Sequence, residues 1–507
     1  MRSVFGRPSG AVRRRGQAPP ESGAAGVVDG ECAAPGRPRT ASSSARGRAG
    51  RAGCAARLNA VVARGKKQRR SRVPTGRLER LARIGLLAGE IAAGGVAEGV
   101  RRLAGGDASG SLLVTQANAE RLTHRLSGMR GAAMKLGQLL SMEGEDLLPP
   151  EVASALLMLR ADADAMPPSQ LRRVLGRAWG KGWEGRFREF DWEPIAAASI
   201  GQVHRAVAAD GRELALKIQY PGVSRSIASD VDNLAATLRI SRILPRDVDL
   251  RELIAEVKRQ LRQEVDYRIE AEHLRRYGAL LADEPCFRVP GVVKEFTTTR
   301  VLAMERLIGL PIEDLRGPDH PRERRDRVGA ALFQLLLREL FGYRFVQTDP
   351  NLANYLWLPE SQQVGLVDLG AAREIPERLA RLYAQLCRAA LRGDRRELGR
   401  AAEEMGFLPP GEPSERREAL IDFVELTCEP FATGSSYDFA ASDLPARVRE
   451  AATRLAFRHG FRKPPPPETL FVQRKLGGTF LQCARLGACF GARAILEDEL
   501  ARLPDAA

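Results

Sequence analysis

Two polar segments separated by a short apolar run constrain the fold of this chain more than any other feature. The first, QTDPNLANYL (residues 347–356), sets Asp349 and Asn354 five residues apart. The second, GLVDLGAAR (residues 365–373), sets Asp368 at the end of the apolar run. Asp, Asn and Pro are also common turn formers, so this spacing has a purely structural explanation as well. The remainder of the chain has to decide between a turn and a site.

Two predicted strands precede these segments. They are IAAASIGQVHRAV (residues 195–207) and RELALKIQY (residues 212–220), and the turn AADG lies between them. Lys217 falls on the second strand among apolar neighbours, whereas a lone strand lysine is more often a solvent-facing edge charge. The first strand fits the pattern G-x-G-x-x-G-x-V with alanine at its first two glycine positions, a pattern that covers ATP phosphates in kinases. The candidate nucleotide-binding residues of this loop are Ala196, Ala197, Ala198, Ser199, Gly201 and Val203.

A long amphipathic helix is predicted next, because Leu253, Ile254, Val257, Leu261, Val265 and Ile269 recur at helical spacing. It carries three acidic residues, Glu264, Asp266 and Glu270. Either Glu264 or Glu270 is expected to pair with Lys217, but not both, because six residues of α-helix rotate a side chain by about 600°. The alternative is an exposed acidic and basic helix face. The stretch VVKEFTTTRVLAMERL (residues 292–307) resembles a hairpin, and its Met304 and Glu305 stand where kinases have the hinge that contacts adenine.

The order of these features predicts a bilobal protein-kinase-like fold of the α+β class. In kinases the catalytic-loop Asp is followed five residues later by a magnesium-binding Asn, and then by the metal-binding Asp of D-F-G. Asp349, Asn354 and Asp368 fit these roles, with Leu369 in place of Phe. Asp349 and Lys217 are therefore the candidate catalytic residues, Asn354 and Asp368 the candidate Mg²⁺ ligands, and ATP the expected substrate.

Three departures argue against phosphorylation of protein substrates. Gln347 and Thr348 replace the usual His-Arg before the catalytic Asp. Asn351 stands where protein kinases usually carry a phosphate-contacting lysine. No A-P-E motif follows Asp368, and LGAAREIP (residues 369–376) leaves little room for an ordinary activation loop.

The net charge of +16 comes almost entirely from the N-terminal region. Residues 1–80 hold 19 Lys and Arg against 4 Asp and Glu, and the remainder holds 60 against 59. Residues 1–75 are predicted to be a disordered basic tail, with an organellar transit peptide, an upstream start-site artefact and a nucleic-acid or lipid-binding tail as alternatives. Phe5 is the only aromatic residue there, so no nucleic-acid partner is expected.

The remaining sequence signals favour a reducing compartment and a helical extension. The seven cysteines are scattered and form no CxxC pair. The apolar stretch at residues 77–104 is interrupted by glutamates, so it is predicted to lie on a membrane surface or to pack in a helical extension, and not to span a bilayer. The predicted domains are the tail (1–75), the helical extension (76–165), the N-lobe (166–305) and the C-lobe (306–507).

Six motifs together resemble the UbiB/AarF atypical kinases, a family that supports coenzyme Q (ubiquinone) biosynthesis. They are KLGQLLSM, AAASIGQVH, ALKIQYPGV, EVDYRIEAE, QTDPNLAN and VDLGAAREI, and the resemblance covers about residues 76–500. The QTDPN form is similar to the branch shared by mitochondrial and some bacterial members. The resemblance implies a Mg²⁺- and ATP-binding fold with ATPase-like activity near membranes that hold polyprenyl quinone precursors, with other ubiquinone-biosynthesis proteins as partners. It also implies that Lys135 and Gln138 of the K-x-G-Q motif meet Glu264 and Asp266.

We therefore expect a peripheral membrane ATPase at the inner face of a bacterial cytoplasmic membrane, with the mitochondrial matrix face as the alternative. Two other functions remain open at this point. One is a small-molecule or lipid phosphotransferase, and the other is a pseudokinase scaffold that binds nucleotide without turnover.

Overall fold

Five strands form the antiparallel sheet of the N-lobe, in the order β1-β3-β4-β6, and β2 pairs with the first three residues of β3. The predicted strand–turn–strand unit is confirmed, since β3 and β4 pair along seven positions from Gly201↔Gln219 to Val207↔Glu213. The central strand β4 is buried at six of its seven residues, which places Lys217 in an apolar interior. The strands are β1 (Phe187–Phe190), β2 (Ala196–Ala198), β3 (Gly201–Ala208), β4 (Glu213–Gln219) and β6 (Val301–Glu305).

The computed structural model describes most of the chain from residue 165 onward, and these residues belong to one unit, Gly65–Ala507. The predicted tail and helical extension, with Lys135 and Gln138, lie outside the described residues. The described ranges are 165–224, 228–229, 231–232 and 251–503, apart from 318, 409–410, 412, 433 and 458–466. The predicted domain boundaries stay predictions.

The predicted long helix is in fact two helices, α8 (Arg251–Glu264) and α9 (Tyr267–Leu280). The break follows from Asp266, whose backbone is extended and whose side chain accepts a hydrogen bond from the backbone N–H of Arg268. An aspartate that caps the first turn of a new helix competes with continuation of the old one. Periodicity did not reveal the break, because apolar residues recur at helical spacing on both sides of it.

The hairpin predicted at residues 292–307 is confirmed only in part. Its second half is β6, but its first half holds a single bridge, Val292↔Met304, followed by the 3₁₀ turn η3 (Lys294–Phe296). Residue Trp179 at the end of α6 (Pro168–Trp179) donates its indole N–H to the carbonyl of Phe296. This contact and the surrounding aromatic rings hold η3 against the N-lobe sheet.

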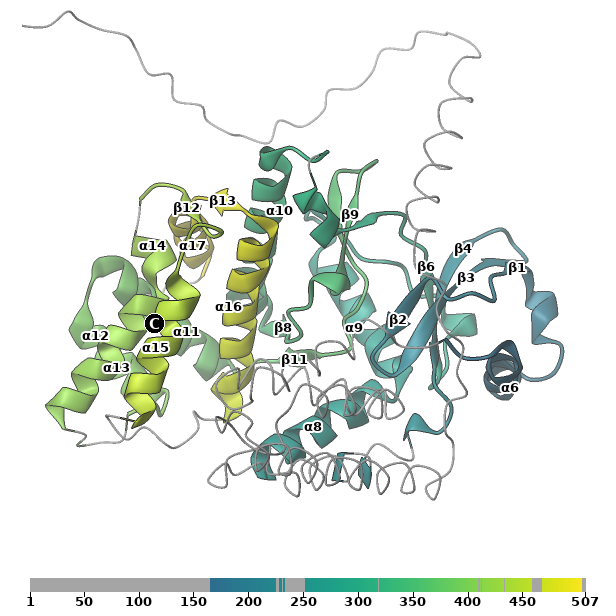
Figure 1. The fold of residues 1–507 in the computed structure, drawn as a ribbon, viewed down its shortest axis with the longest axis horizontal. Coiled ribbons are helices and arrows are strands. Elements are labelled where there is room, and N and C mark those ends of the chain that lie inside the picture. The colour runs from purple at the N-terminus through teal and green to yellow at the C-terminus, as the bar shows by residue number, and fades with distance from the viewer. Residues whose placement is uncertain are drawn as a thin grey trace, which may run out of the picture. The chain divides into compact units, whose positions relative to one another are not determined.

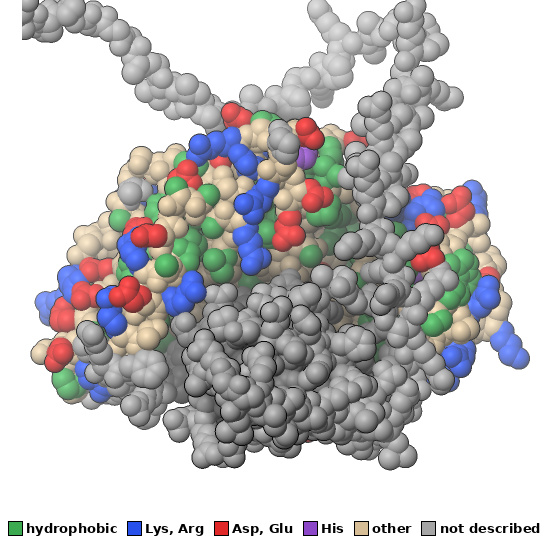
Figure 2. Space-filling view, viewed as in Figure 1, with side chains coloured by type: hydrophobic (Ala, Val, Ile, Leu, Met, Phe, Trp, Pro, Cys, Tyr) green, Lys and Arg blue, Asp and Glu red, His purple; other side chains and the backbone are tan. Residues whose placement is uncertain are grey.

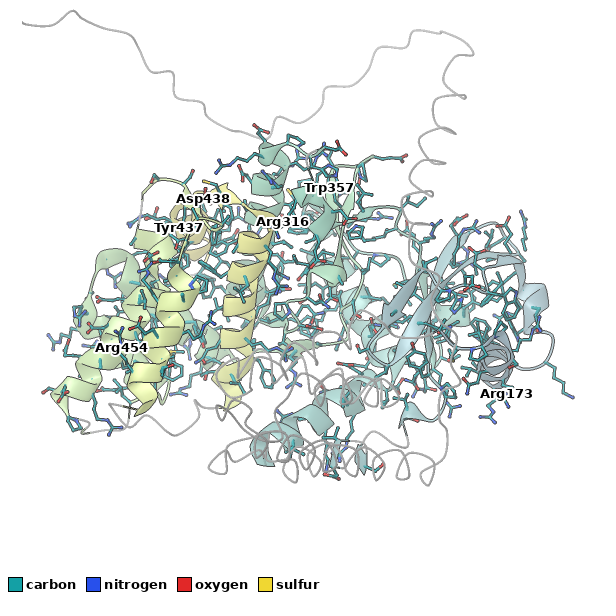
Figure 3. The ribbon with its side chains drawn as sticks, viewed as in Figure 1. Arg173, Arg316, Trp357, Tyr437, Asp438 and Arg454 are labelled. Atoms are coloured by element: carbon teal, nitrogen blue, oxygen red, sulfur yellow. The ribbon has the colours of Figure 1, made fainter. Side chains whose placement is uncertain are left out.

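A second sheet of short strands, in the order β5-β10-β9-β7, lies at the start of the C-lobe. Trp357 of β9 is buried at its centre, where it lies opposite both Leu310 and Val364 (Figure 3). A separate two-stranded ladder pairs Ala372 of β11 with Gln347 of β8. The strands are β5 (Phe287–Arg288), β7 (Leu310–Pro311), β8 (Phe345–Gln347), β9 (Tyr355–Leu358), β10 (Gln363–Leu366) and β11 (Ala372–Glu374).

Helices make up most of the C-lobe, as predicted. The long helices α10 and α16 lie side by side in the middle of Figure 1, and α10 continues into a π-helical turn, η5 (Arg338–Tyr343). The fold is therefore the predicted one, with a β-rich N-lobe and a mainly helical C-lobe. The helices are α10 (Arg322–Leu337), α11 (Glu377–Arg392), α12 (Arg395–Glu404), α13 (Ser414–Thr427), α14 (Glu429–Ala432), α15 (Leu444–Phe457), α16 (Pro467–Leu486) and α17 (Ala492–Ala501).

Short elements complete the described fold. The pair β12 (Tyr437–Asp438) and β13 (Cys489–Phe490) joins the end of α14 to the start of α17. The 3₁₀ turns are η2 (Trp183–Arg186), η4 (Ile312–Arg316) and η6 (Leu352–Asn354). Acidic and basic side chains are interspersed on the part of the surface that Figure 2 describes, in keeping with the near balance of charge after residue 80. Within the described residues, no helix is both long enough and apolar enough to cross a bilayer.

Candidate active site

A pocket lies between the two lobes, where the N-lobe hairpin, α8, α9 and the two polar segments meet. Segments more than 150 residues apart in the sequence contribute to it. The lining residues are Ser199, Ile200, Lys217, Glu264, Tyr267, Glu270, Asp349, Asp368, Gly370 and Ala371.

The Lys217 ammonium is the centre of this pocket. It donates to both carboxylate oxygens of Glu270 at 2.7 and 2.9 Å, and to Asp368 Oδ2 at 2.8 Å. Burial alone would lower the pKa of Lys217, but the charges of Asp368 and Glu270 outweigh it, so the pKa lies well above its ordinary value. Lys217 is therefore a permanent cation. Of the two expected partners, the structure selects Glu270.

Glu270 and Asp368 share that one ammonium from opposite lobes. The Glu270 side chain is almost fully buried, and this burial raises the pKa of its carboxyl. The like charge of Asp368 raises that pKa as well, whereas the attraction of Lys217 opposes the rise. The Asp368 side chain is about one third exposed, and its Oδ1 also accepts a hydrogen bond from the Gly370 N–H. With both carboxylates ionised, the three groups carry a net charge of −1.

Helix α9 places Glu270 one turn after the cap at Asp266, on the same face as the buried residues Ala271 and Leu274. The C-terminal half of α9 is fixed by Tyr277, whose hydroxyl donates to Glu339 of η5 at 2.9 Å. The Tyr277 hydroxyl also lies 3.2 Å from the carbonyl of Phe345, on the strand that leads to Asp349. The helix that carries the ion-pair partner is therefore tied directly to the segment that carries the candidate catalytic carboxylate.

The alanine-rich loop is a tight hairpin whose two turn residues, Ser199 and Ile200, lie in the pocket. Gly201 follows the turn, and a Cβ atom there would lie 2.3 Å from the Ile218 carbonyl and 2.8 Å from the Tyr267 hydroxyl. Only glycine fits such a close approach of backbone to backbone. The Tyr267 ring lies beneath the loop, with its centroid 5.5 Å from the Lys217 ammonium.

Gln347 and Thr348, which replace the usual His-Arg, connect the two polar segments. The Gln347 side-chain amide donates to the Asp368 carbonyl at 2.6 Å, and the Thr348 hydroxyl donates to the Ala371 carbonyl at 2.8 Å. Both residues are fully buried. Their hydrogen bonds fix Asp349 relative to Asp368, although the two are 19 positions apart in the sequence.

The amide of Asn354 is oriented by its neighbour in the same way. Its Nδ2 donates to the Asp349 carbonyl at 3.1 Å, so the amide oxygen is the end left to face a cation. The described residues hold no group of three or more His, Cys, Asp or Glu side chains able to bind a metal. One carboxylate and one amide oxygen fit Mg²⁺, which keeps most of its coordination sphere for water and phosphate oxygens.

Helix α16, which the motifs did not single out, packs against the Asp349 segment. A Cβ atom on Gly478 would lie 2.1 Å from Pro350 Cγ, so glycine allows the helix to touch the loop. One turn earlier, Arg474 Nη2 lies 3.8 Å from Asp349 Oδ1. Lys475 beside it forms a buried ion pair with Glu339 at 3.0 Å. The sequence shows no motif at these residues, apart from the basic pair Arg474-Lys475 within a largely apolar stretch.

The other predicted site residues are placed as follows. Glu264, at the end of α8, lines the pocket, whereas Asp266 caps α9. The side chains of the remaining loop and hinge residues are not among those lining the pocket, and Glu305 pairs instead with Arg288 at 2.9 Å. Their nucleotide-binding role stays a prediction. These residues are Ala196, Ala197, Ala198, Gly201, Val203, Met304 and Glu305.

Comparison with known proteins gives one consistent family. Residues 158–402 match the model of the ABC1 atypical kinase-like domain. Among curated relatives, the atypical kinase COQ8B, mitochondrial, of Rattus norvegicus is 40% identical over 85% of this chain and 82% of its own length. Atypical kinase COQ8, mitochondrial, is 38% identical in Schizosaccharomyces pombe, over 82% of this chain and 68% of its own. In Saccharomyces cerevisiae it is 36% identical, over 82% of this chain and 83% of its own.

Similarity to solved structures points to the same fold. The complex of Rv3197 with erythromycin from Mycobacterium tuberculosis superposes with a TM-score of 0.53 at 26% sequence identity. The match covers 76% of this chain and 95% of that one.

Proposed function

Because the chain belongs to the ABC1 atypical kinase-like family, we propose that it binds ATP with Mg²⁺ in this pocket and acts as an ATPase. The observation that carries the proposal is the Lys217 ammonium held between Glu270 and Asp368, 2.7–2.9 Å from each. In kinases the lysine of this pair contacts ATP phosphates, and the acidic residue of the next helix orients it. The chain is an atypical kinase, and hydrolysis is the reaction we propose for it.

The chemical step assigns one role to each polar group. A water oxygen bonds to the γ-phosphorus while the bond from that phosphorus to the bridging oxygen breaks, and ADP leaves with the electron pair. The attacking water gives a proton to the Asp349 carboxylate, which later returns it to solvent. Lys217 holds phosphate oxygens of the nucleotide. Asn354 and Asp368 would hold Mg²⁺, which neutralises negative charge on the phosphates.

We further propose that this activity supports ubiquinone biosynthesis at a membrane surface. The support is the resemblance of six motifs to the UbiB/AarF kinases and the similarity to the COQ8 kinases. Those relatives are mitochondrial by name, which agrees with the matrix face, the second of the two expected locations, more than with a bacterial membrane. Polyprenyl quinone precursors and other proteins of the pathway are the proposed partners. Complementation of a quinone-deficient strain tests the role, since failure of the wild-type chain to restore quinone would count heavily against it.

The direct test measures Mg²⁺-dependent ATP hydrolysis by the full chain, with and without liposomes, beside Asp368→Asn. Turnover that rises with liposomes and disappears in the variant supports a membrane-activated ATPase with Asp368 as a metal ligand. Exposed Asp314, on η4 outside the pocket, gives the matched control Asp314→Asn, which should hydrolyse ATP like the wild type. Nucleotide binding without turnover in the wild type would favour a scaffold instead.

A phosphotransferase is the second candidate, and the short segment after Asp368 favours a small acceptor over a peptide. Because β11 pairs with β8 directly after Asp368, no long loop is present to hold a peptide. With γ-labelled ATP, label in an extractable lipid or metabolite would identify transfer. Label found only in free phosphate would exclude it.

A further inference from the structure

The Asp349 segment has no cation of its own. Asn351 stands where protein kinases usually carry a phosphate-contacting lysine, and its side-chain oxygen accepts a hydrogen bond from the Ala353 N–H. The residue therefore serves as the cap of the turn η6. A loop that lacks this lysine supplies no cation to the phosphate group that would react beside Asp349.

Arg474, on helix α16 near the end of the chain, brings a guanidinium next to Asp349. Its Nη2 lies 3.8 Å from Asp349 Oδ1, too far for a hydrogen bond but close enough for an ion pair. The residue is 9% exposed, and within the described structure neither Nε nor Nη2 has a hydrogen-bond partner. Buried guanidinium N–H groups are costly to leave unpaired, so the observation points to a ligand.

The helix is fixed so that this guanidinium cannot drift away from Asp349. Gly478, one turn after Arg474, touches Pro350, the residue that follows Asp349. Lys475, the next residue, pairs with Glu339 at 3.0 Å in the fully buried interior. These two contacts, at the next residue and one turn later, hold the helix against the Asp349 segment, so Arg474 is positioned by a helix and not by a flexible loop.

Two further arginines lie near Arg474, beside the acidic residues Asp349 and Glu264. Burial and the positive charges of Arg259 and Arg474 together lower the pKa of Arg373 to about 10. Arg373 and Arg259 both lie over the ring of Phe471, with guanidinium carbons 4.1 and 5.9 Å from its centroid. A group of arginines that raise one another's electrostatic energy favours the approach of an anion.

We propose that Arg474 is a catalytic residue that contacts the γ-phosphoryl group during its transfer, in place of the lysine missing at Asn351. The inference rests on the proposed phosphoryl-transfer function and adds a residue to it. As the bond from the γ-phosphorus to the bridging oxygen breaks and the new oxygen–phosphorus bond forms, charge spreads over the equatorial oxygens. The two N–H groups of Arg474 would donate to those oxygens. Contacts of this kind are often long in the free enzyme and shorten only when the reacting complex forms.

The test compares ground-state and transition-state binding in the full chain. Dissociation constants for Mg²⁺–ATP and for Mg²⁺–ADP–aluminium fluoride, a mimic of the transferring phosphoryl group, are measured for the wild type, Arg474→Met and Arg474→Lys. Exposed Arg485, at the end of the same helix, gives the matched control Arg485→Met. The double variant Arg474→Met with Asn351→Lys restores a cation at the usual kinase position. Melting temperatures show which variants are folded.

We expect Arg474→Met to bind ATP within about threefold of the wild type and to bind the mimic roughly 100-fold more weakly, the size of loss found when one charge-stabilising donor is removed. Asn351→Lys should recover at least about tenfold of that loss, and Arg485→Met should lose nothing. Equal weakening of both ligands, or no weakening, would overturn the inference, as would a wild type that does not bind the mimic. Should the wild type bind both ligands but hydrolyse no ATP, the proposed ATPase fails while the binding ratio still decides the role of Arg474.

Discussion

The buried ion pair between Lys475 and Glu339 makes the sharpest prediction about the C-lobe. Replacement of Lys475 by Met removes the ammonium 3.0 Å from Glu339 Oε2 and keeps a side chain of similar length. Glu339 is fully buried and keeps the hydrogen bonds donated by the Tyr277 hydroxyl and the Gln347 backbone N–H, but no cationic partner. The carboxylate is then an uncompensated charge in an apolar interior.

The distance gives the expected magnitude. Two unit charges 3.0 Å apart attract by about 5.5 kcal/mol at an effective dielectric constant of about 20. Removal of one partner of a buried pair typically costs about 3–5 kcal/mol, because the remaining charge stays desolvated and has no oppositely charged partner. We therefore expect Lys475→Met to lower the free energy of unfolding by about 3–5 kcal/mol at neutral pH.

Urea unfolding at pH 7.5 measures this loss, and the double variant Lys475→Met with Glu339→Gln is the control. A neutral amide at 339 still accepts from Tyr277 but carries no charge, so the double variant should recover more than half of the lost stability. A double variant no more stable than Lys475→Met would refute the electrostatic reasoning and leave side-chain packing as the cause.

The pH dependence of the same variant has a definite sign. Burial raises the pKa of Glu339 above its ordinary value, against the opposing effect of Lys475. Without the lysine the folded-state pKa rises further, so the folded state binds the proton more tightly than the unfolded chain does. The variant is then most stable below the unfolded pKa of about 4.3 and loses stability as the pH rises through the folded-state pKa. Its deficit relative to the wild type should shrink between pH 7.5 and pH 5.5.

Three further predictions concern single positions. Gly478→Ala should lower the rate of ATP hydrolysis at least about tenfold, because the new Cβ would displace Pro350, whereas Gly477→Ala, with no atom within 4 Å, should have no such effect. Gly201→Ala should abolish nucleotide binding, measured by fluorescence titration, because the new Cβ would lie 2.3 Å from the backbone carbonyl of Ile218 in β4. An unchanged affinity would mean that the hairpin does not shape the pocket. Burial lowers the pKa of His204 from 6.5 to about 4, so the folded state takes up this proton less readily than the unfolded chain. The free energy of unfolding should therefore fall by about 3 kcal/mol as the pH drops from 6.5 to about 4. His204→Gln should reduce this pH dependence of the melting temperature in thermal unfolding.

The fold could be predicted from the sequence because few folds place these particular residues in this order. Lys217 on a strand, an acidic helix, Asp349 five residues before Asn354, and Asp368 after an apolar run are each ordinary alone. Their order restricts the fold to one architecture, and the sheet order and the helical C-lobe agree with it. The choice between Glu264 and Glu270 could not be made from periodicity, because the cap at Asp266 resets the helix between them.

The contribution of α16 was out of reach for a different reason. Arg474 and Asp349 are 125 positions apart and share no motif, so only tertiary packing brings them to 3.8 Å. Gly478 similarly reads as one more helical glycine until its contact with Pro350 is known. Local patterns carry information about elements, whereas contacts of this kind depend on how two elements cross.

The register Ala372↔Gln347 leaves the segment after Asp368 no slack, since α11 begins only a few residues later at Glu377. A switch that swings this segment outward would first have to break the ladder. Movement at this site is instead coupled to α9, which the two residues Val265 and Asp266 separate from the end of α8, and whose His273 Nδ1 lies 2.9 Å from the Leu369 carbonyl oxygen. A ligand that stabilises one position of α9 changes the affinity for nucleotide, and the nucleotide changes the affinity for that ligand by the same factor. An effector is then recognisable, whatever its chemistry, as a compound whose own binding tightens or weakens when ADP is added.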